Sequence, residues 1–501
     1  MNTPKILLAI LLLALVTTIQ GVGLCNNFTH IQTGGYDYAY DTIQNSPNEA
    51  AWLATHHDII IGLGDWQTGR MPETLYDTMK RANPNARFYQ YIAYNTMLPN
   101  MSTEMEAWCQ ANGRNAEELY YHYYNDTQVR LRNNQLVTFR GYGGGSAQTL
   151  KDARVPATWW SGQYPNINPT SQTFREAFKA YAANVITVNK ANNKYCDGVL
   201  LDTFEGTVDT YFDIHLENTI ELRNLGVTES AAARRRVTTD LLASKNDLEA
   251  YLSQYAGKTI RVIPNAADVD NVYQWFPDVY KNALASPYDE LSIEFLITSG
   301  YTSLARIPRL KQVYDDMAAG FFFFINSQTN YEQNVPFNFT QFILAVHYLI
   351  NHPNGCFSYH LGSASYYGGR DGTLQNTHWH KNIEYDLGKP TIRSQPDYWG
   401  EQNTDRFFVF ADGGSQYKIL GREYERALVL AKFGNVGGWA NIGINPTTHE
   451  LPGDFRRLLA DNSLGPVIRQ VTLGFAEGAI LIKDAPAMTI APPRNLRVIS
   501  R

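Results

Sequence analysis

Two hydrophobic patterns alternate along the chain from about residue 30 to residue 362. Short apolar runs, such as Ile59-Ile60-Ile61 and Phe321-Phe322-Phe323-Phe324, are typical of strands buried on both faces, as in a parallel sheet. Eight such strands are predicted, at Ile31–Tyr40, Asp58–Leu63, Arg87–Tyr94, Gly198–Asp202, Thr259–Pro264, Leu291–Ile297, Gly320–Ile325 and Cys356–His360. The segments between them have helical periodicity and predict helices at Glu49–His56, Pro72–Ala82, Ser171–Asn189, Ser230–Tyr255, Leu304–Ala319 and Asn338–Ile350.

This alternation favours an α/β fold, a (β/α)8 TIM barrel over residues 26–390. A doubly wound open sheet is the alternative. The connection after the third strand, at about 95–195, is far longer than the others and is predicted to contain a helix at Glu104–Tyr124. Long insertions in compact domains are usually either functional or disordered. This one starts at the carboxyl end of a strand, where such barrels build their active sites.

The helical period fades after Lys389-Pro390, and the pattern becomes that of a small antiparallel β domain, of β-sandwich type, over 391–484. Its strands are predicted where apolar runs lie between Gly, Pro and Asn turns, at Arg406–Ala411, Ala427–Lys432, Val467–Phe475 and Ala479–Ile482. Residues 485–501 are predicted to be a linker or tail.

The first residues have the pattern of an export signal. One positive charge at Lys5 precedes the apolar run Ile6–Val16, and the small residues Gly21-Val22-Gly23 follow. We expect residues 1–23 to be a signal peptide and the protein to be extracellular, with an uncleaved N-terminal anchor as the alternative. No later stretch has the roughly 20 apolar residues of a bilayer span, so no integral membrane span is expected after cleavage.

Composition narrows the choice of partners. The 42 Lys and Arg against 48 Asp and Glu give a net charge of −6 without a basic run, which argues against nucleic acid and anionic membranes. Aromatic residues make up 13% of the chain, a surplus that suits either a core or a surface that stacks on sugars. The four cysteines lack a CxxC pair, so they are either disulfide-bonded or buried free thiols. No motif indicates a metal site or a cofactor, and we expect neither.

Two carboxylates at predicted strand ends carry the main chemical hypothesis. Asp202 ends the apolar strand Gly198–Asp202, and Glu294 lies within Leu291–Ile297. Glycosidic cleavage needs two carboxyl groups, one protonated to assist the leaving oxygen and one ionised as nucleophile or base. Carboxylates on the fourth and sixth strands of one barrel can face each other across its mouth. We therefore assign Asp202 as nucleophile or base and Glu294 as general acid. The alternative is that Asp202 caps a loop and Glu294 forms a buried ion pair.

The same residues carry a resemblance. Asp197-Gly198-Val199-Leu200-Leu201-Asp202 resembles the fourth-strand motif of glycoside-hydrolase-like TIM barrels, in which the last Asp is catalytic. The likeness extends to Glu294, to Asp386-Leu387-Gly388-Lys389-Pro390 and to the segment from Arg422 to Leu430. Together these segments resemble hypothetical glycosyl hydrolase family 15 over about residues 30–485. The resemblance implies a barrel that cleaves glycosidic bonds with a carboxylate pair.

Several further side chains are predicted to bind substrate at the same rim. Asp65 and Trp66 follow the second strand, and Asn265 ends the fifth, where it could donate to a sugar hydroxyl. Glu205 could orient Asp202 or replace it as the acid. Stacking faces are expected among the aromatic residues Tyr91, Tyr94, Tyr142, Trp159 and Trp160. For each of these the alternative is ordinary loop or core packing.

The sequence therefore predicts a secreted glycoside hydrolase that acts on a polysaccharide or oligosaccharide with an Asp/Glu pair. The alternative is a non-catalytic extracellular carbohydrate-binding or structural surface protein on a TIM-barrel scaffold. An esterase or deacetylase has less support, because no Gly-x-Ser-x-Gly segment is present.

Overall fold

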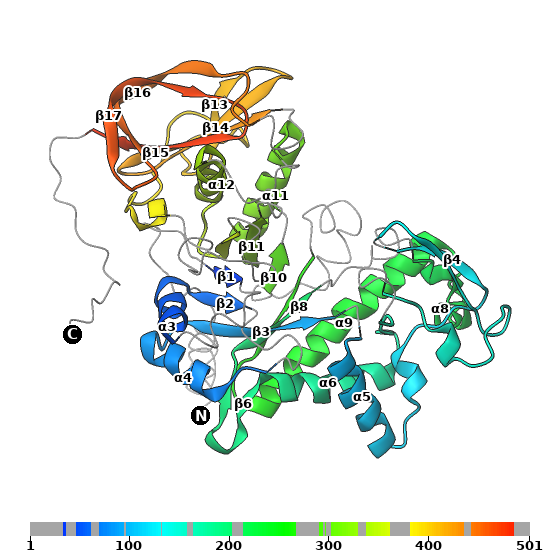
Figure 1. Ribbon diagram of the computed structural model, residues 1–501. Helices are drawn as coiled ribbons and strands as arrows, with labels where there is room; N and C mark the ends of the chain where they lie inside the picture. The colour runs from blue at the N-terminus through cyan, green and yellow to red at the C-terminus, as the bar shows by residue number, and fades with distance from the viewer. Residues whose placement is uncertain are drawn as a thin grey trace, which may run out of the picture.

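The structure is a computed structural model. It describes residues 34–36, 47–61, 70–94, 97–131, 133–157, 164–202, 214–266, 290–293, 296, 302–328, 337–360, 381–434 and 442–484. In these ranges an α/β part with parallel strands precedes an antiparallel sheet close to the carboxyl end, and the two parts lie one above the other (Figure 1).

The α/β part contains eight parallel strands, in the places that the apolar runs predict. They are β1 (Gly34–Tyr36), β2 (Ile59–Ile61), β3 (Arg87–Ala93), β8 (Gly198–Asp202), β9 (Arg261–Pro264), β10 (Glu290–Ile293), β11 (Phe322–Gln328) and β12 (Gly355–His360). They form two sheets, with the orders β1-β2-β3-β8-β9 and β10-β11-β12. A parallel bridge between Asn265 and Ser292 joins the end of β9 to β10, and β12 contacts β1.

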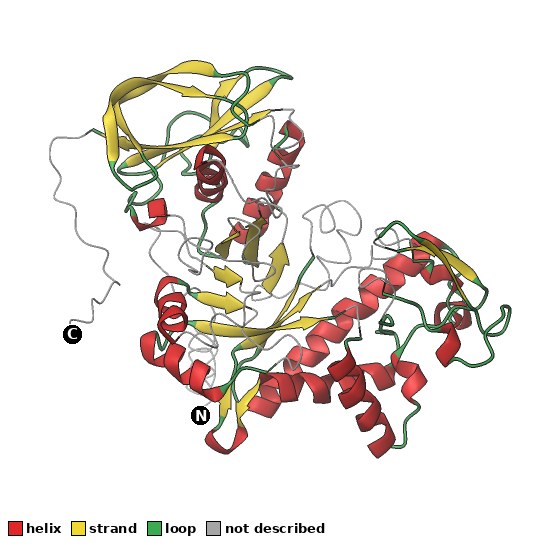
Figure 2. Cartoon of the chain, in the orientation of Figure 1, coloured by secondary structure: helices red, strands yellow, loops and turns green. Residues whose placement is uncertain are grey.

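The six predicted helices are also present. They are α3 (Pro47–His56), α4 (Glu73–Ala82), α6 (Gln172–Ile186), α9 (Ser230–Ala256), α11 (Ile307–Ala318) and α12 (Phe337–Leu349). The start of α6 follows from its N-cap, because the Ser171 side chain accepts a hydrogen bond from the Phe174 amide. Figure 2 shows helices around the parallel strands on more than one side, and these helices cover one apolar face of the strands.

The long insertion folds into a lobe of its own beside the strands (Figure 1). Its elements are α5 (Pro99–Ala111), the hairpin β4 (Thr127–Arg130) and β5 (Leu136–Phe139), helix α6, and the short pair β6 (Thr187–Asn189) and β7 (Lys194–Tyr195). Helix α8 (Ile220–Asn224), from the connection between β8 and β9, lies beside it, where the Ile220 amide donates to the His122 carbonyl oxygen. The predicted helix over Glu104–Tyr124 is wrong beyond Ala111. Asn112 leaves the helical conformation and Gly113 has a φ of +64°, a left-handed stop that glycine adopts without strain.

Short 3-10 turns connect several of these elements. They lie at Ala116–Leu119, Lys151–Ala153, Lys190–Asn192, Leu216–Asn218, Leu304–Arg306 and Lys381–Glu384. The turn at Ala116–Leu119 begins where the Asn115 side chain accepts from the Glu117 amide.

The C-terminal part is a single six-stranded antiparallel sheet with the order β13-β14-β15-β18-β16-β17. Its strands are β13 (Phe408–Asp412), β14 (Tyr417–Glu423), β15 (Ala427–Gly434), β16 (Thr447–Leu458), β17 (Leu464–Leu473) and β18 (Glu477–Lys483). All six pair within this one sheet, whereas the sequence predicts a β-sandwich. The strands β14 and β16 are additions to the four that the sequence predicts.

The antiparallel sheet docks onto helix α12. Residues such as Val429 and Ile480 on one sheet face share a core with α12, while the opposite face has its own apolar cluster around Leu428 and Leu481. Gly478 in β18 allows the close approach, because a Cβ there would lie 2.6 Å from the Gln341 carbonyl oxygen of α12.

The described cysteines Cys109, Cys196 and Cys356 are buried free thiols, and Cys25 lies outside the described residues. Within the part of the chain that the structure describes, no helix combines the length and the apolar character that a membrane crossing requires.

Candidate functional site

The parallel strands have two distinct faces. Alternate residues such as Val199, Leu201 and Val262 pack outward in the core that includes the helices. The residues between them form a second cluster, which we call the inner face. It contains Ile59, Ile61, Tyr89, Leu200, Ile263, Phe322, Phe324 and Cys356, with Tyr91 packed against it. Because these residues come from both parallel sheets, the inner faces of the two sheets pack against each other.

A charged cluster occupies the amino-terminal end of the inner face. Glu290, the first residue of β10, accepts hydrogen bonds from Arg87 Nη1 at 2.9 Å and from the Tyr89 hydroxyl at 3.0 Å. Burial would lower the pKa of the Arg87 guanidinium, but Tyr89 and Glu290 outweigh it and raise that pKa. Burial raises the pKa of the Tyr89 hydroxyl well above its usual value. Arg87 and Tyr89 both bind Glu290, and the three side chains lie at the end of the inner face opposite to Asp202.

Asp202 lies at the carboxyl end of β8, where the sequence predicts a catalytic carboxylate. Its side chain is partly buried, and both of its oxygens accept hydrogen bonds. Asn265 Nδ2 donates to Oδ1 at 2.7 Å, and the Tyr91 hydroxyl donates to Oδ2. The donors stand on the neighbouring strand β3 and at the end of the other neighbour, β9. Two neighbouring strands therefore fix the orientation of this carboxylate from both sides.

Three polar side chains continue this end of the inner face on the second sheet. They are Ser292 on β10, Asn326 on β11 and Ser358 on β12, each with no exposed surface. The Ser292 and Ser358 hydroxyls and both polar atoms of the Asn326 amide have no hydrogen-bond partner among the described residues. A buried polar group without a partner destabilises a protein by about 1–3 kcal/mol. These three side chains, which we call the polar row, therefore destabilise the fold unless a polar group binds to them.

The structure brings one predicted substrate-binding residue to Asp202 and turns another away from it. Asn265, predicted to bind a sugar hydroxyl, contacts Asp202. Tyr94 is turned away, because it packs among the helices against Phe174 and Phe178, and its hydroxyl donates to Ser244 of α9. The structure does not bring the Tyr94 side chain to Asp202. Six further predicted site residues lie outside the described residues, namely Asp65, Trp66, Trp159, Trp160, Glu205 and Glu294.

Sequence reasoning missed the polar inner-face residues. Tyr91 is named only as a stacking candidate, and Ser292, Asn326 and Ser358 are not named at all. The alternation of residues along a strand could have found them. Each of the four lies two or four residues from another inner-face residue of its own strand. Strand alternation therefore assigns them to the face of Leu200, and hence of Asp202.

The two later segments that carry the family resemblance, Asp386–Pro390 and Arg422–Leu430, contact each other. They lie where the antiparallel sheet joins the α/β part. Arg426 forms an ion pair with Asp386, and the Arg426 amide donates to the Leu387 carbonyl oxygen at 3.0 Å. Arg422 is buried against the end of α12, where Nη1 donates to the Asn351 carbonyl oxygen at 2.7 Å. These contacts hold the antiparallel sheet on the α/β part.

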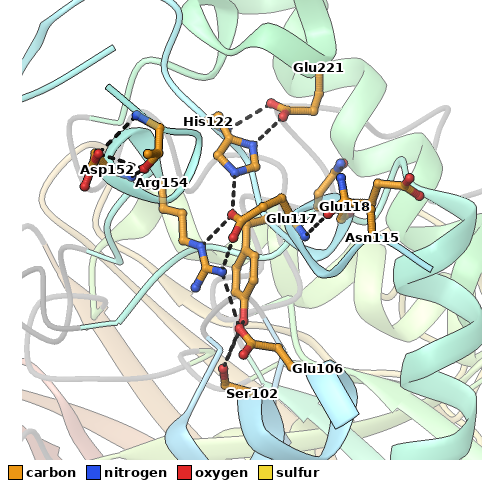
Figure 3. Close-up of polar contacts among 12 residues, drawn as sticks. Ser102, Glu106, Asn115, Glu117, Glu118, His122, Asp152, Arg154 and Glu221 are labelled. Atoms are coloured by element: carbon orange, nitrogen blue, oxygen red, sulfur yellow. Dashed lines mark hydrogen bonds and ion pairs between the residues drawn. The ribbon is translucent and has the colours of Figure 1, made fainter. Parts of the chain in front are cut away.

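A second polar cluster lies in the insertion lobe (Figure 3). The buried His122 ring is held between two carboxylates, with Nδ1 2.7 Å from Glu221 Oε1 and Nε2 3.1 Å from Glu117 Oε2. Arg154 makes two hydrogen bonds to Glu117, at 2.7 and 2.9 Å, and also reaches Glu106. Each of these groups has a partner within the cluster, so we interpret the cluster as the support of the lobe and keep Asp202 as the candidate catalytic group.

The structure gives no support for a metal centre in the described residues, where no group of three His, Cys, Asp or Glu side chains is placed to hold an ion.

Comparison with known proteins gives only weak likenesses. No family model matches the chain, and no curated protein matches it in sequence. Among solved structures, the isomaltulose synthase from Klebsiella sp. LX3 has a TM-score of 0.44 at 10% identity, covering 91% of this chain and 99% of that one. The trehalulose synthase MutB from Pseudomonas mesoacidophila MX-45 has a TM-score of 0.44 at 11% identity, covering 92% and 100%. Likenesses this weak place the chain in no family, and we draw no activity from them.

Proposed function

We propose that this protein is a glycoside hydrolase in which Asp202 is the nucleophile or base. The observation that carries the proposal is the anchoring of the Asp202 carboxylate at the carboxyl end of β8, with one oxygen bound by Tyr91 and the other by Asn265. A carboxylate in this role must stay oriented while charge develops on the sugar, and two fixed donors supply that orientation.

The proposal includes closure of the eight parallel strands into a (β/α)8 barrel. Two features support it, namely the Asn265–Ser292 bridge between the two sheets and the contact of β12 with β1. In a closed barrel the carboxyl ends of all strands surround one site. Asp202 and the row of Ser292, Asn326 and Ser358 then belong to the same site.

The general acid in this proposal is Glu294, the residue that follows β10 in the chain. Glu290 and Ser292 belong to the inner face, and strand alternation assigns the next member of that set to Glu294. Glu294 in its protonated form donates to the leaving oxygen, while Asp202 attacks the anomeric carbon or activates a water. We further propose that the substrate is a polysaccharide met outside the cell, after removal of residues 1–23.

The test is hydrolysis of a polysaccharide panel by the mature protein, by Asp202→Asn and by Glu294→Gln, measured as reducing ends released. We expect both variants to lose at least 100-fold in rate, since general acid–base catalysis alone contributes roughly 10²–10⁴-fold. Asp412→Asn is the matched control, because this exposed carboxylate pairs with Lys418 in the antiparallel sheet.

The product stereochemistry then separates the two roles of Asp202. Retention of the anomeric configuration, followed by NMR during hydrolysis, identifies a nucleophile, and inversion identifies a base toward water. Equal rates for wild type and Asp202→Asn would refute the proposal. Sugar binding without any turnover by the wild type would instead identify a carbohydrate-binding surface protein.

A further inference from the structure

The inner face carries polar atoms that the fold itself does not use. Ser292, Asn326 and Ser358 are fully buried, and the two hydroxyls and the amide have no partner among the described residues. Burying such groups is unfavourable unless another polar molecule satisfies them. Ordered water or a polar ligand would satisfy these groups.

The strand register places the three side chains at adjacent inner-face positions, because Ser292 pairs with Phe324, two residues before Asn326. Asn326 and Ser358 are direct partners across β11 and β12. Ser292 is bridged to Asn265, whose amide donates to Asp202. Neighbouring strands are about 4.8 Å apart, a spacing at which one sugar ring can contact side chains from two strands.

Their direction is fixed by the residues beside them. Ser327, next to Asn326, points outward and hydrogen-bonds His347 of α12 at 2.8 Å. Phe357, next to Ser358, belongs to the outer core with the helices, whereas Cys356 belongs to the inner cluster. Asn326 and Ser358 therefore point to the inner face, on the side of Asp202.

The chemistry of the row is neutral. Two hydroxyls and one amide offer both donors and acceptors but no charge, which suits the hydroxyl groups of a sugar. The inner-face charges in the described part of the chain are Asp202 and, at the opposite end, the ion pair of Arg87 with Glu290. The negative charge of the Asp202 carboxylate would repel an acidic sugar, and the row provides no cation to offset that repulsion.

From these observations we infer that Ser292, Asn326 and Ser358 form a binding row for the hydroxyl groups of a neutral sugar next to Asp202. The inference rests on the proposed function and adds to it a substrate class, uncharged hexose or pentose units in place of uronic acids or sulfated sugars. The row binds and positions the ring, and Asp202 acts on it.

The experiment measures binding without turnover, by calorimetry on the full-length Glu294→Gln protein, which lacks the proposed general acid and keeps the charge of Asp202. The probes are neutral hexose and pentose tetrasaccharides and a tetragalacturonate. We expect a neutral sugar to bind and the galacturonate not to bind. Adding Asn326→Ala or Ser358→Ala should weaken the binding about tenfold each, the usual effect of losing one buried hydrogen bond.

Ser327→Ala is the matched control, because it removes a hydroxyl group from the position next to Asn326 on the same strand. It loses the bond to His347 and should lower the unfolding temperature while leaving the sugar affinity unchanged. Ser358→Ala should show the opposite behaviour, with weaker binding and no loss of stability, because its hydroxyl has no bond within the described part of the fold.

Unchanged affinity in Asn326→Ala and Ser358→Ala would overturn the inference and leave water as the occupant of the row. Tighter binding of the galacturonate, or no binding of any neutral sugar, would overturn it as well. These results are distinct from failure of the proposed hydrolase, which shows as unchanged hydrolysis by Asp202→Asn and does not enter the binding measurement.

Discussion

The docking of the antiparallel sheet on α12 depends on one buried arginine. Arg422 of β14 is 1% exposed, and Nη1 donates to the carbonyl oxygens of Tyr348, Leu349 and Asn351 at 3.3, 3.0 and 2.7 Å. Its Nε donates to the Asp405 carbonyl oxygen at 2.9 Å. The last carbonyls of a helix have no partner within it and carry partial negative charge. The guanidinium therefore caps α12 and finds there a counter-charge for its own burial.

Replacement by methionine, Arg422→Met, keeps most of the apolar stem and removes the donors. The Leu349 and Asn351 carbonyl oxygens then lose a buried donor and the Asp405 carbonyl oxygen a partly buried one, while the Tyr348 carbonyl oxygen keeps its bond from the Tyr424 hydroxyl. At about 1 kcal/mol for each lost bond, the free energy of unfolding should fall by about 3 kcal/mol. Tyr424→Phe removes one bond, from the Tyr424 hydroxyl to the Tyr348 carbonyl oxygen at 2.6 Å, and should cost about 1 kcal/mol.

The assay is urea unfolding combined with hydrogen exchange of peptides that cover α12. Arg469→Met is the matched control, since the Arg469 side chain is 77% exposed in its ion pair with Asp454. Exposed pairs of this kind contribute roughly 0–1 kcal/mol. A loss for Arg422→Met no larger than that of Arg469→Met, with unchanged exchange in α12, would refute the capping role.

Two further predictions concern charged groups away from the proposed catalytic residues. Burial alone would lower the pKa of His122, but hydrogen bonds to Glu117 and Glu221 outweigh it and raise that pKa. The stabilisation by the charged ring is fully present below the unfolded pKa of about 6.5 and is lost as pH rises through the raised folded pKa. Hydrogen exchange in the insertion lobe should therefore become faster as pH rises through that range. The same pH dependence of exchange in His122→Gln would contradict the prediction. Glu290→Gln leaves the partly buried Arg87 without its counter-charge, so the free energy of unfolding in urea should fall by about 3 kcal/mol. The sugar affinity should not change. A weakened affinity would show that the two ends of the inner face are coupled.

The sequence by itself determined the order of elements in the α/β part. Strands buried on both faces need continuous apolar runs, and helices that cover them need a 3.6-residue period, so both are visible locally. For the same reason the pattern alone assigns Asp202, a carboxylate directly after such a run, to the end of a strand.

The local hydrophobic pattern does not predict the bounds of an element where a strand is largely exposed or where a single residue's backbone conformation ends a helix. The strand Thr447–Leu458 was missed because it contains Pro452-Gly453 and many exposed polar residues. The helix predicted over Glu104–Tyr124 continues in hydrophobic pattern, but a left-handed glycine at Gly113 stops it.

Only the tertiary structure decided the partners of the site residues. Tyr91 and Asp202 are 111 positions apart, and Asn265 and Asp202 are 63 apart, so no local pattern links them. Tyr91 and Tyr94 lie on one short stretch of chain, yet the first points to Asp202 and the second to α9. An odd separation puts two residues on opposite faces of a strand, but which face holds the site is fixed by the packing of strands and helices.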